Sequence, residues 1–162
     1  MTLALYPGTF DPFHNGHLDI ARRALALFDE LVIGVYDLPD KKLLFTHAER
    51  VALIQACLHD IGVDGRAHVR GYSGLTVNFA REVKADVMVR GLRNSVDFDF
   101  ELQMTQTNHW LAGDIEAAFL MANSPNHFLS ATLIRQITNL GGDVSTLVPP
   151  NVAQALKKKP AR

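Results

Sequence analysis

Two histidines stand in "PGTFDPFHNGHLDI", a stretch that separates a short apolar run from a helical pattern. Gly8 lets the backbone approach a ligand closely, and the Asn-Gly turn after His14 opens a helix. Free amides and the helix dipole at such a terminus favour phosphate. His17 is expected in the first helical turn, facing the bound group, with the Thr9 hydroxyl close by. The stretch therefore predicts an anion-binding loop.

Two other interpretations of this loop remain open. His14, His17 and Asp11 could ligate a metal ion, although His-x-x-His is weak evidence and no fourth ligand stands at a useful spacing. The loop could also be a turn whose histidines bond only to the backbone. Its glycine spacing matches neither the dinucleotide fingerprint nor the P-loop.

A second polar stretch, "VRGLRNSVDFDFE", carries Arg90 and Arg93. Arginine offers planar, permanently charged donor forks that match phosphate oxygens. Two such residues at the end of a buried strand predict an anionic partner. The alternative is a set of structural ion pairs with the following acidic residues, and both can hold in part. Those acidic residues are Asp97, Asp99 and Glu101.

Two further stretches add hydroxyl and ammonium groups. In "NSPNHFLSATLIR", Ser130 and Thr132 bring hydroxyls to another helix N-terminus, which suits phosphate. Ordinary helix capping by Ser130 needs no ligand, however. In "DLPDKKLLFT", Lys41 and Lys42 are either a solvated pair or positive charge at the mouth of a site.

The elements that must position these residues follow from hydrophobic periodicity. Helical patterns fit 17–28, the segment after Thr46 in "THAE", 75–83, 96–111 with Ser95 as its cap, the segment from Ser130 to "GGD", and "VPPNVAQALKK". Apolar runs of strand length lie at Leu3–Tyr6, Leu31–Tyr36, His68–Tyr72, Asp86–Val89 and Glu116–Met121.

Alternation of strands and helices predicts a single-domain, Rossmann-like α/β fold. We expect a doubly wound sheet of five parallel strands with helices on both faces. The polar stretches 7–17, 90–101 and 122–132 each follow a predicted strand. Ligands of such sheets bind at the carboxyl ends of the strands. The order of elements therefore predicts one crevice lined by three loops.

The composition sets the class of protein. The 162 residues suit one domain, 1–162, whose residues 156–162 we expect to be a basic, solvated tail. With a formal net charge of −1, the protein has no overall electrostatic attraction to nucleic acid or a membrane. The N-terminus does not resemble a signal peptide, and no apolar run reaches membrane-spanning length. A single cysteine, Cys57, fits a buried structural thiol and a cytoplasmic location.

Four stretches together, "YPGTFDPFHNGH", "KKLLFT", "RGLRNSVDFDFE" and "LSATLIR", resemble the bacterial phosphopantetheine adenylyltransferase family. This family belongs to the nucleotidyltransferases with an (H/T)-x-G-H motif, and the likeness runs from about residue 4 to 156. The sequence departs from the common family pattern at Ala131, where serine is usual, and at Thr76, where a larger apolar residue is frequent. Gly74 stands where an acidic residue is frequent.

The resemblance implies an activity and its partners. The enzyme would transfer an adenylyl group from ATP to 4′-phosphopantetheine, giving dephospho-coenzyme A and pyrophosphate in the penultimate step of coenzyme A biosynthesis. Mg²⁺ would accompany the nucleotide, held mainly by phosphate oxygens and water rather than by a protein metal site. The resemblance also implies a homohexamer, a dimer of trimers, with coenzyme A as a feedback ligand.

The family's functional positions carry over residue by residue. The implied catalytic residues are His17, Lys41 and Thr9. The implied substrate-binding residues are Thr9, Lys41, Thr76 and Arg90. The implied ATP-binding residues are Thr9, Phe10, His17, Gly91, Leu92, Arg93, Glu101, Asn126, His127, Phe128, Leu129, Ser130, Ala131 and Thr132.

Two alternative functions stay open at this point. Another adenylyl- or cytidylyltransferase of the superfamily, acting on nicotinamide or nicotinate mononucleotide or on glycerol phosphate, shares the first loop and its histidine. A regulator that binds a nucleotide or coenzyme A without turnover would share the phosphate-binding groups.

Overall fold

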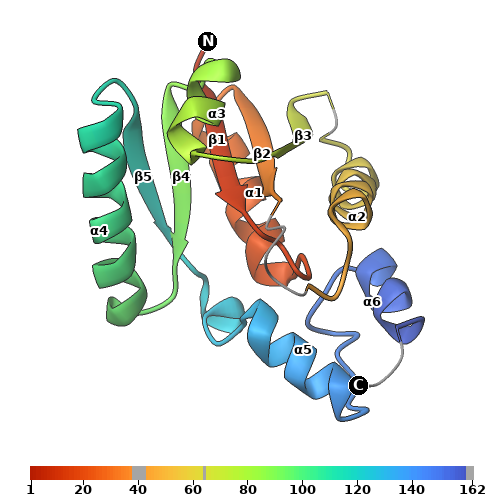
Figure 1. Ribbon diagram of the computed structural model, residues 1–162. Helices are drawn as coiled ribbons and strands as arrows, with labels where there is room; N and C mark the ends of the chain where they lie inside the picture. The colour runs from red at the N-terminus through yellow and green to blue at the C-terminus, as the bar shows by residue number, and fades with distance from the viewer. Residues whose placement is uncertain (38–42, 64, 160–162) are drawn as a thin grey trace.

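The computed structural model describes residues 1–37, 43–63 and 65–159. Their strands form a parallel, five-stranded sheet in the order β3-β2-β1-β4-β5 (Figure 1). Each strand falls on an apolar run that the sequence predicts, so the predicted fold class is confirmed. The strands are β1 (Leu3–Gly8), β2 (Glu30–Tyr36), β3 (Ala67–Tyr72), β4 (Val87–Leu92) and β5 (Glu116–Met121).

Of the six α-helices in the described residues, four begin at a polar side chain that caps them and two do not. Thr46 and Glu49 form the expected capping box at α2, and Ser130 accepts the Leu133 N–H at α5. The cap of α4 is Asn94 rather than the predicted Ser95, because the Asn94 side chain accepts the amide of Asp97 at 2.9 Å. The helices are α1 (Asn15–Leu27), α2 (His47–Asp60), α3 (Thr76–Glu82), α4 (Ser95–Leu111), α5 (Ala131–Asn139) and α6 (Pro150–Lys157), with a 3₁₀ turn at Ser124–Asn126.

Helices cover both faces of the sheet. On one face, Ala4, Ile33 and Val89 pack with residues of α1, α2, α5 and α6. On the other face, Leu5 and its neighbours pack against α3 and the residues that follow α4. Successive side chains of β1 therefore pack into two separate cores, one on each face of the sheet, as expected for a strand in the middle of the sheet.

The sheet opens between β1 and β4. β1 pairs with β2 along its whole length, from Leu3 to Gly8, but with β4 only at Ala4 and Leu5. The strand order also reverses here, because β2 and β3 lie on one side of β1 and β4 and β5 on the other. This is the switch point at which doubly wound sheets bind ligands. The predicted crevice therefore has a physical origin in the divergence of two strands.

Two features of the chain differ from the sequence prediction. β4 continues to Leu92, so Arg90 and Gly91 belong to the strand and not to the loop after it. Residues 156–159 are also not a purely solvated segment. Leu156 is buried in α6, and Lys159 binds Glu49 at 2.9 Å while lying over the Phe45 ring. Residues 160–162 of the expected tail lie outside the described residues.

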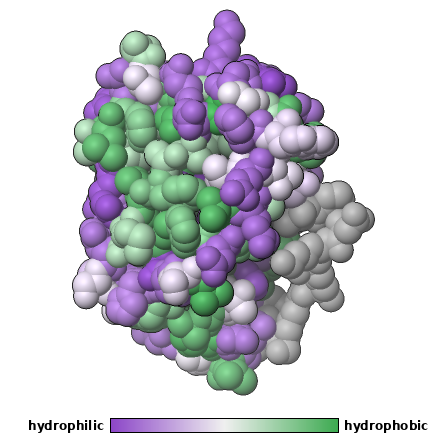
Figure 2. All heavy atoms as spheres, turned by 90° about the vertical axis from the view of Figure 1, so that its left-hand side faces the viewer, coloured by the Kyte–Doolittle hydropathy of each residue, from purple (hydrophilic) through white to green (hydrophobic). Residues whose placement is uncertain are grey.

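The helix α4 differs from the others because it buries none of its residues. Large apolar side chains on it stay exposed, including Trp110 at 83 % and Val96 at 75 %. Figure 2 faces the side of the molecule on which α4 and β5 lie, and apolar residues gather across it. No helix in the described part of the chain is long and apolar enough to cross a membrane.

Candidate active site

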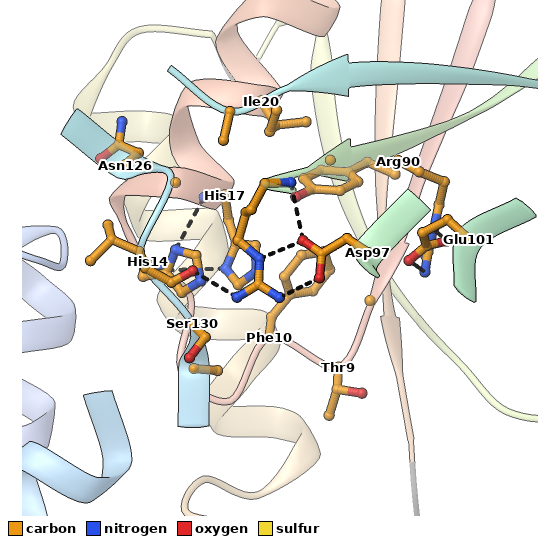
Figure 3. A pocket seen from close by; sticks show the side chains of 18 of the residues that line it. Thr9, Phe10, His14, His17, Ile20, Arg90, Asp97, Glu101, Asn126 and Ser130 are labelled. Carbon is orange, nitrogen blue, oxygen red and sulfur yellow. Dashed lines mark hydrogen bonds and ion pairs between the residues drawn. The ribbon is translucent and has the colours of Figure 1, made fainter. Parts of the chain in front are cut away.

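The two histidines of the first loop form the N-terminal cap of α1. The His17 amide donates to His14 Nδ1 at 3.3 Å, and the His14 amide donates to His17 Nδ1 at 3.2 Å. The rings stack with their centroids 3.6 Å apart. His17 thus occupies the first helical turn, as predicted, and both Nδ1 atoms are acceptors. Figure 3 shows the pair at the wall of a cavity.

Burial keeps both rings neutral. Loss of solvent lowers the pKa of His14 to about 3, with the Arg93 charge as a second cause. The pKa of His17 also lies well below its usual value, again because of burial first and then because of the neighbouring His14 and Arg93. Since Nδ1 of a neutral His17 accepts a hydrogen bond, its proton is on Nε2. The ring therefore offers one N–H donor and no charge.

Aromatic packing fixes the rest of the first loop. Phe10 adopts a left-handed backbone conformation with φ of 52°, which costs energy for a residue other than glycine. Its ring lies 5.0 Å from His17 and 5.6 Å from Phe13, and a Cβ at Gly8 would meet that ring at 2.8 Å. Gly8 is thus required because the Phe10 ring folds back over it.

The two arginines of the second stretch each hold a carboxylate. Arg90 makes a two-pronged pair with Glu101, with both N–O distances at 2.6 Å, and Arg93 does the same with Asp97 at 2.8 and 2.9 Å. Arg90 also donates to the carbonyl of Pro7 at 2.9 Å, across the gap where β1 and β4 have parted. The structural ion pairs considered as an alternative are therefore present, and their partners sit on α4.

These pairs influence the ionisation of their members. Burial alone would lower the pKa of Arg90, but the hydrogen bonds and charge of Glu101 raise it overall. Burial would raise the pKa of Asp97, but the Arg93 contacts lower it overall. Arg90 and Asp97 are thus each held in the charged form near neutral pH.

Two adjoining cavities occupy the crevice. The first, of about 430 Å³, is lined by the histidine pair and by residues of β4, α4 and the start of α5. The second, of about 360 Å³, extends toward α3 and α4 and includes Tyr72 and Thr76. The two share a wall made of Pro7, Gly8, Thr9, Arg90, Phe100 and Glu101. A ligand in each cavity would therefore meet the other at Thr9 and Arg90.

Most of the predicted site residues line these cavities. The first cavity brings together Thr9, Phe10, His17, Arg90, Gly91, Arg93, Glu101, Asn126, Leu129, Ser130 and Ala131. The second brings together Thr9, Thr76 and Arg90, and the Thr76 hydroxyl lies 3.0 Å from that of Tyr72. At Ser130 the hydroxyl is already the acceptor of the α5 cap.

Other predicted residues lie elsewhere. Four residues of the ATP-binding set line neither cavity among the described residues: Leu92, His127, Phe128 and Thr132. Leu92 is buried, and Phe128 is half exposed. The Thr132 hydroxyl accepts from Arg135 at 3.1 Å. The prediction for Lys41 falls outside the described residues.

The residues described offer no group of three or more His, Cys, Asp or Glu side chains suited to a metal ion. Asp11 is buried, and its carboxylate accepts the amides of Leu44 and Phe45 at 2.8 and 2.9 Å. It therefore ties the first loop to the segment that leads into α2, and its oxygens are not shared with the two histidines.

The sequence analysis did not single out Arg50, which supports the same loop. Its side chain is buried, and Nη1 donates to the carbonyls of Thr9 at 2.6 Å and Tyr36 at 2.8 Å. The sequence does contain a signal for Arg50, because its spacing from Ile54 and Cys57 places all three on the same, buried face of a helix. A charged residue at core spacing marks a polar partner inside the fold.

Comparison with known proteins identifies the family. The Cytidylyltransferase-like family model matches residues 5–137. The chain is 48% identical over 158 residues to the phosphopantetheine adenylyltransferase of Roseiflexus sp. (strain RS-1), covering 98% of this chain and 97% of that protein. The relative of the same name from Moorella thermoacetica is 49% identical over 160 residues, with 98% of each chain covered. The chain belongs to the phosphopantetheine adenylyltransferase family.

A solved structure extends the comparison to the fold. A protein from Vibrio parahaemolyticus that carries the name of a nicotinate-nucleotide adenylyltransferase superposes with a TM-score of 0.71. The match covers 98% of this chain and all of that one, at 19% identity. This chain thus shares its fold with that protein.

Proposed function

We propose that this chain is a phosphopantetheine adenylyltransferase that joins ATP to 4′-phosphopantetheine and releases pyrophosphate. The observation that carries the proposal is the pair of adjoining cavities with Thr9 and Arg90 in their common wall. Adenylyl transfer needs two anions held against each other, and that wall is where the two ligands would meet. The near-identical lengths and 48–49% identity of relatives with this name support the same activity.

The reaction assigns a role to each cavity. The nucleotide would occupy the first cavity, and the arm of phosphopantetheine the second. An oxygen of the 4′-phosphate attacks the α-phosphorus of ATP, a new P–O bond forms, and the bond to the β-phosphate oxygen breaks so that pyrophosphate leaves. The attacking phosphate is already an anion near neutral pH. The protein therefore needs to position groups and stabilise charge rather than to supply a base.

His17 is the proposed donor to the reacting phosphate. Because Nδ1 accepts a hydrogen bond, the proton of the neutral His17 ring is on Nε2. The neutral ring keeps this N–H donor throughout the working range of pH. Thr9 and Lys41 would add a hydroxyl and a positive charge, and Arg90 would hold the acceptor phosphate. Arg90 and Arg93 would exchange part of their carboxylate contacts for phosphate contacts.

The remaining ATP contacts are proposed for Phe10, Gly91, Leu92, Arg93, Glu101 and residues 126–132. Mg²⁺ fits this site as part of a magnesium–nucleotide complex. It would retain several waters and bind through substrate phosphates rather than through a protein cage. When bound, it neutralises phosphate charge.

The test is pyrophosphate release from ATP and Mg²⁺ with 4′-phosphopantetheine and nicotinamide mononucleotide as rival acceptors. We expect turnover with phosphopantetheine alone. His17→Asn is expected to lower kcat by about 10²–10³ because one transition-state donor is lost. Binding of nucleotide with no turnover on either acceptor would instead support a regulator and refute the proposal.

We also propose the homohexameric assembly of the family, a dimer of trimers, with coenzyme A as a feedback ligand and a cytoplasmic location. The exposed apolar side chains of α4 support burial of this face between subunits. Light scattering on the intact protein should give about 107 kDa, six times the 17.9 kDa of one chain. A mass of one chain at micromolar concentration would refute the hexamer. Inhibition of turnover by added coenzyme A tests the feedback ligand.

A further inference from the structure

Arg50 lies at the point where the β1–β2 ladder ends. The last paired residues of these strands in register are Gly8 and Val35, and the next positions are Thr9 and Tyr36. The carbonyls of both next residues accept from Arg50 Nη1, at 2.6 and 2.8 Å. The guanidinium thus satisfies two carbonyls that the ladder leaves behind and holds them a fixed distance apart.

The other edge of the same short segment is held in a similar way. Arg90 donates to the Pro7 carbonyl from the β4 side, and Arg50 donates to the Thr9 carbonyl from the opposite side. Two arginines thus bind the backbone at positions two residues apart. Gly8 lies between them. The segment from Pro7 to Thr9 belongs to the wall shared by both cavities. Its position therefore sets where the two proposed substrates meet.

The ion pair of Arg50 is too weak to account for the buried guanidinium. Its partner within 4.0 Å, Asp37, is 46 % exposed at an N–O distance of 3.9 Å, whereas the Arg50 side chain is 1 % exposed. The charge of the buried Asp11 carboxylate also favours the charged guanidinium, but burial still lowers the pKa of Arg50 overall. Burying a charge is costly, and an apolar side chain of similar volume often gives equal or greater stability. Within the described part of the chain, the hydrogen bonds of the guanidinium are the two from Nη1 to the backbone carbonyls, while Nε is buried without a hydrogen-bond partner.

We infer that Arg50 is a positioning residue for adenylyl transfer: it fixes the Thr9 backbone and so the alignment of the two phosphates, without touching either substrate. This inference rests on the proposed function. A displacement of about 1 Å in a reacting geometry can cost about 10²-fold in rate even when the altered residue is remote. Loss of Arg50 should therefore act on kcat more than on the binding of either substrate.

The experiment compares Arg50→Met, which removes the donors, with Arg50→Lys, which retains a shorter donor. Arg66→Met is the matched control, because Arg66 also donates to backbone carbonyls, at Leu25, Phe28 and Asp29, but lines neither cavity among the described residues. Steady-state kinetics are measured for both substrates below the melting temperature of every variant, with the folded fraction taken from circular dichroism.

We expect Arg50→Met to lower kcat by about 10- to 100-fold while each KM changes by less than about threefold. Arg50→Lys should lie between this variant and the wild type, and Arg66→Met should match the wild type in kcat. An unchanged kcat in folded Arg50→Met, or an equal loss in Arg66→Met, would overturn the inference.

Failure to fold is also informative. If Arg50→Met is unfolded, the kinetic comparison is made on Arg50→Lys, for which a kcat loss with little change in KM supports the inference and a wild-type kcat overturns it. If neither variant folds, Arg50 is a general stability determinant and the positioning role is wrong. Wild-type protein that turns over neither acceptor refutes the proposed function itself, which separates the two failures.

Discussion

Lowering the pH from 7.5 to 5 should destabilise the fold through the histidine cap of α1. In the folded chain, His14 and His17 use Nδ1 to accept backbone N–H bonds, and their stacked rings are buried. Protonation at Nδ1 would break the cap and place two charges in contact. The unfolded chain carries no such constraint, so its histidines titrate near the usual pKa of about 6.5.

The sign and size follow from linkage. Below pH 6.5 the unfolded chain binds protons that the folded chain does not, so this stability is present above 6.5 and is lost as the pH falls toward the folded pKa, about 3 for His14. Between pH 7.5 and 5 the loss is about 2 kcal/mol for His14. His17, whose pKa is also lowered by burial, adds a loss of the same sign. The His14 loss alone is a considerable share of a typical domain stability of about 5–15 kcal/mol.

The measurement is urea unfolding at both pH values for the wild type, His14→Thr and His68→Gln. Threonine caps a helix without titrating, so His14→Thr should lose about 2 kcal/mol less than the wild type between the two pH values. His68 is exposed on β3, so His68→Gln serves as the control. Its free energy of unfolding should change between the two pH values by as much as that of the wild type. If His14→Thr retains the full wild-type difference, burial does not hold the His14 ring neutral and the argument for a neutral donor at His17 loses its basis.

Three further predictions concern the surroundings of the site. Asp11→Asn should lower the free energy of unfolding in urea by about 1–3 kcal/mol, because one of the two oxygens that accept backbone amides becomes a donor facing a donor; an unchanged midpoint would contradict this account. Burial raises the pKa of the Cys57 thiol to about 11, so a thiol reagent at pH 8 should label it only after urea unfolds the chain; prompt labelling of the native protein would disprove its burial. Gly34→Ala should lower the melting temperature, because a Cβ there would lie 2.9 Å from the Phe79 ring; a variant as stable as the wild type would show that the ring can move aside.

The sequence was sufficient to locate the five strands, because each contains an apolar run, and to locate the polar loops that follow three of them. It could not show that β4 continues through Arg90, since a charged residue usually ends such a run. The pairing of β4 with β5 as far as Leu92 and Met121 decides this, and that pairing is a tertiary contact. Arg50 was missed for a related reason, because a pattern reveals a charge at a core position but not the carbonyls that receive it.

Some predicted site residues also needed the fold. The resemblance assigned the whole stretch 126–132 to ATP binding. Side chains at the beginning of a helix, however, point in several directions. Asn126, Ser130 and Ala131 face the first cavity, whereas the Thr132 hydroxyl contacts Arg135. Spacing in a loop before a helix does not fix these directions, because the 3₁₀ turn at 124–126 rotates the chain before α5 begins.

If the two cavities hold the substrates as proposed, acceptor recognition and the nucleotide site depend largely on different residues. Only a few residues border both spaces, while Tyr72, Thr76 and Asn108 border the second cavity alone. Substitutions among those three would then reshape acceptor recognition while the histidine cap and the proposed nucleotide cavity remain intact. A lineage could therefore explore new acceptors in small steps, keeping a working adenylyl donor site throughout, and the same three positions are where a laboratory search for altered acceptors should begin.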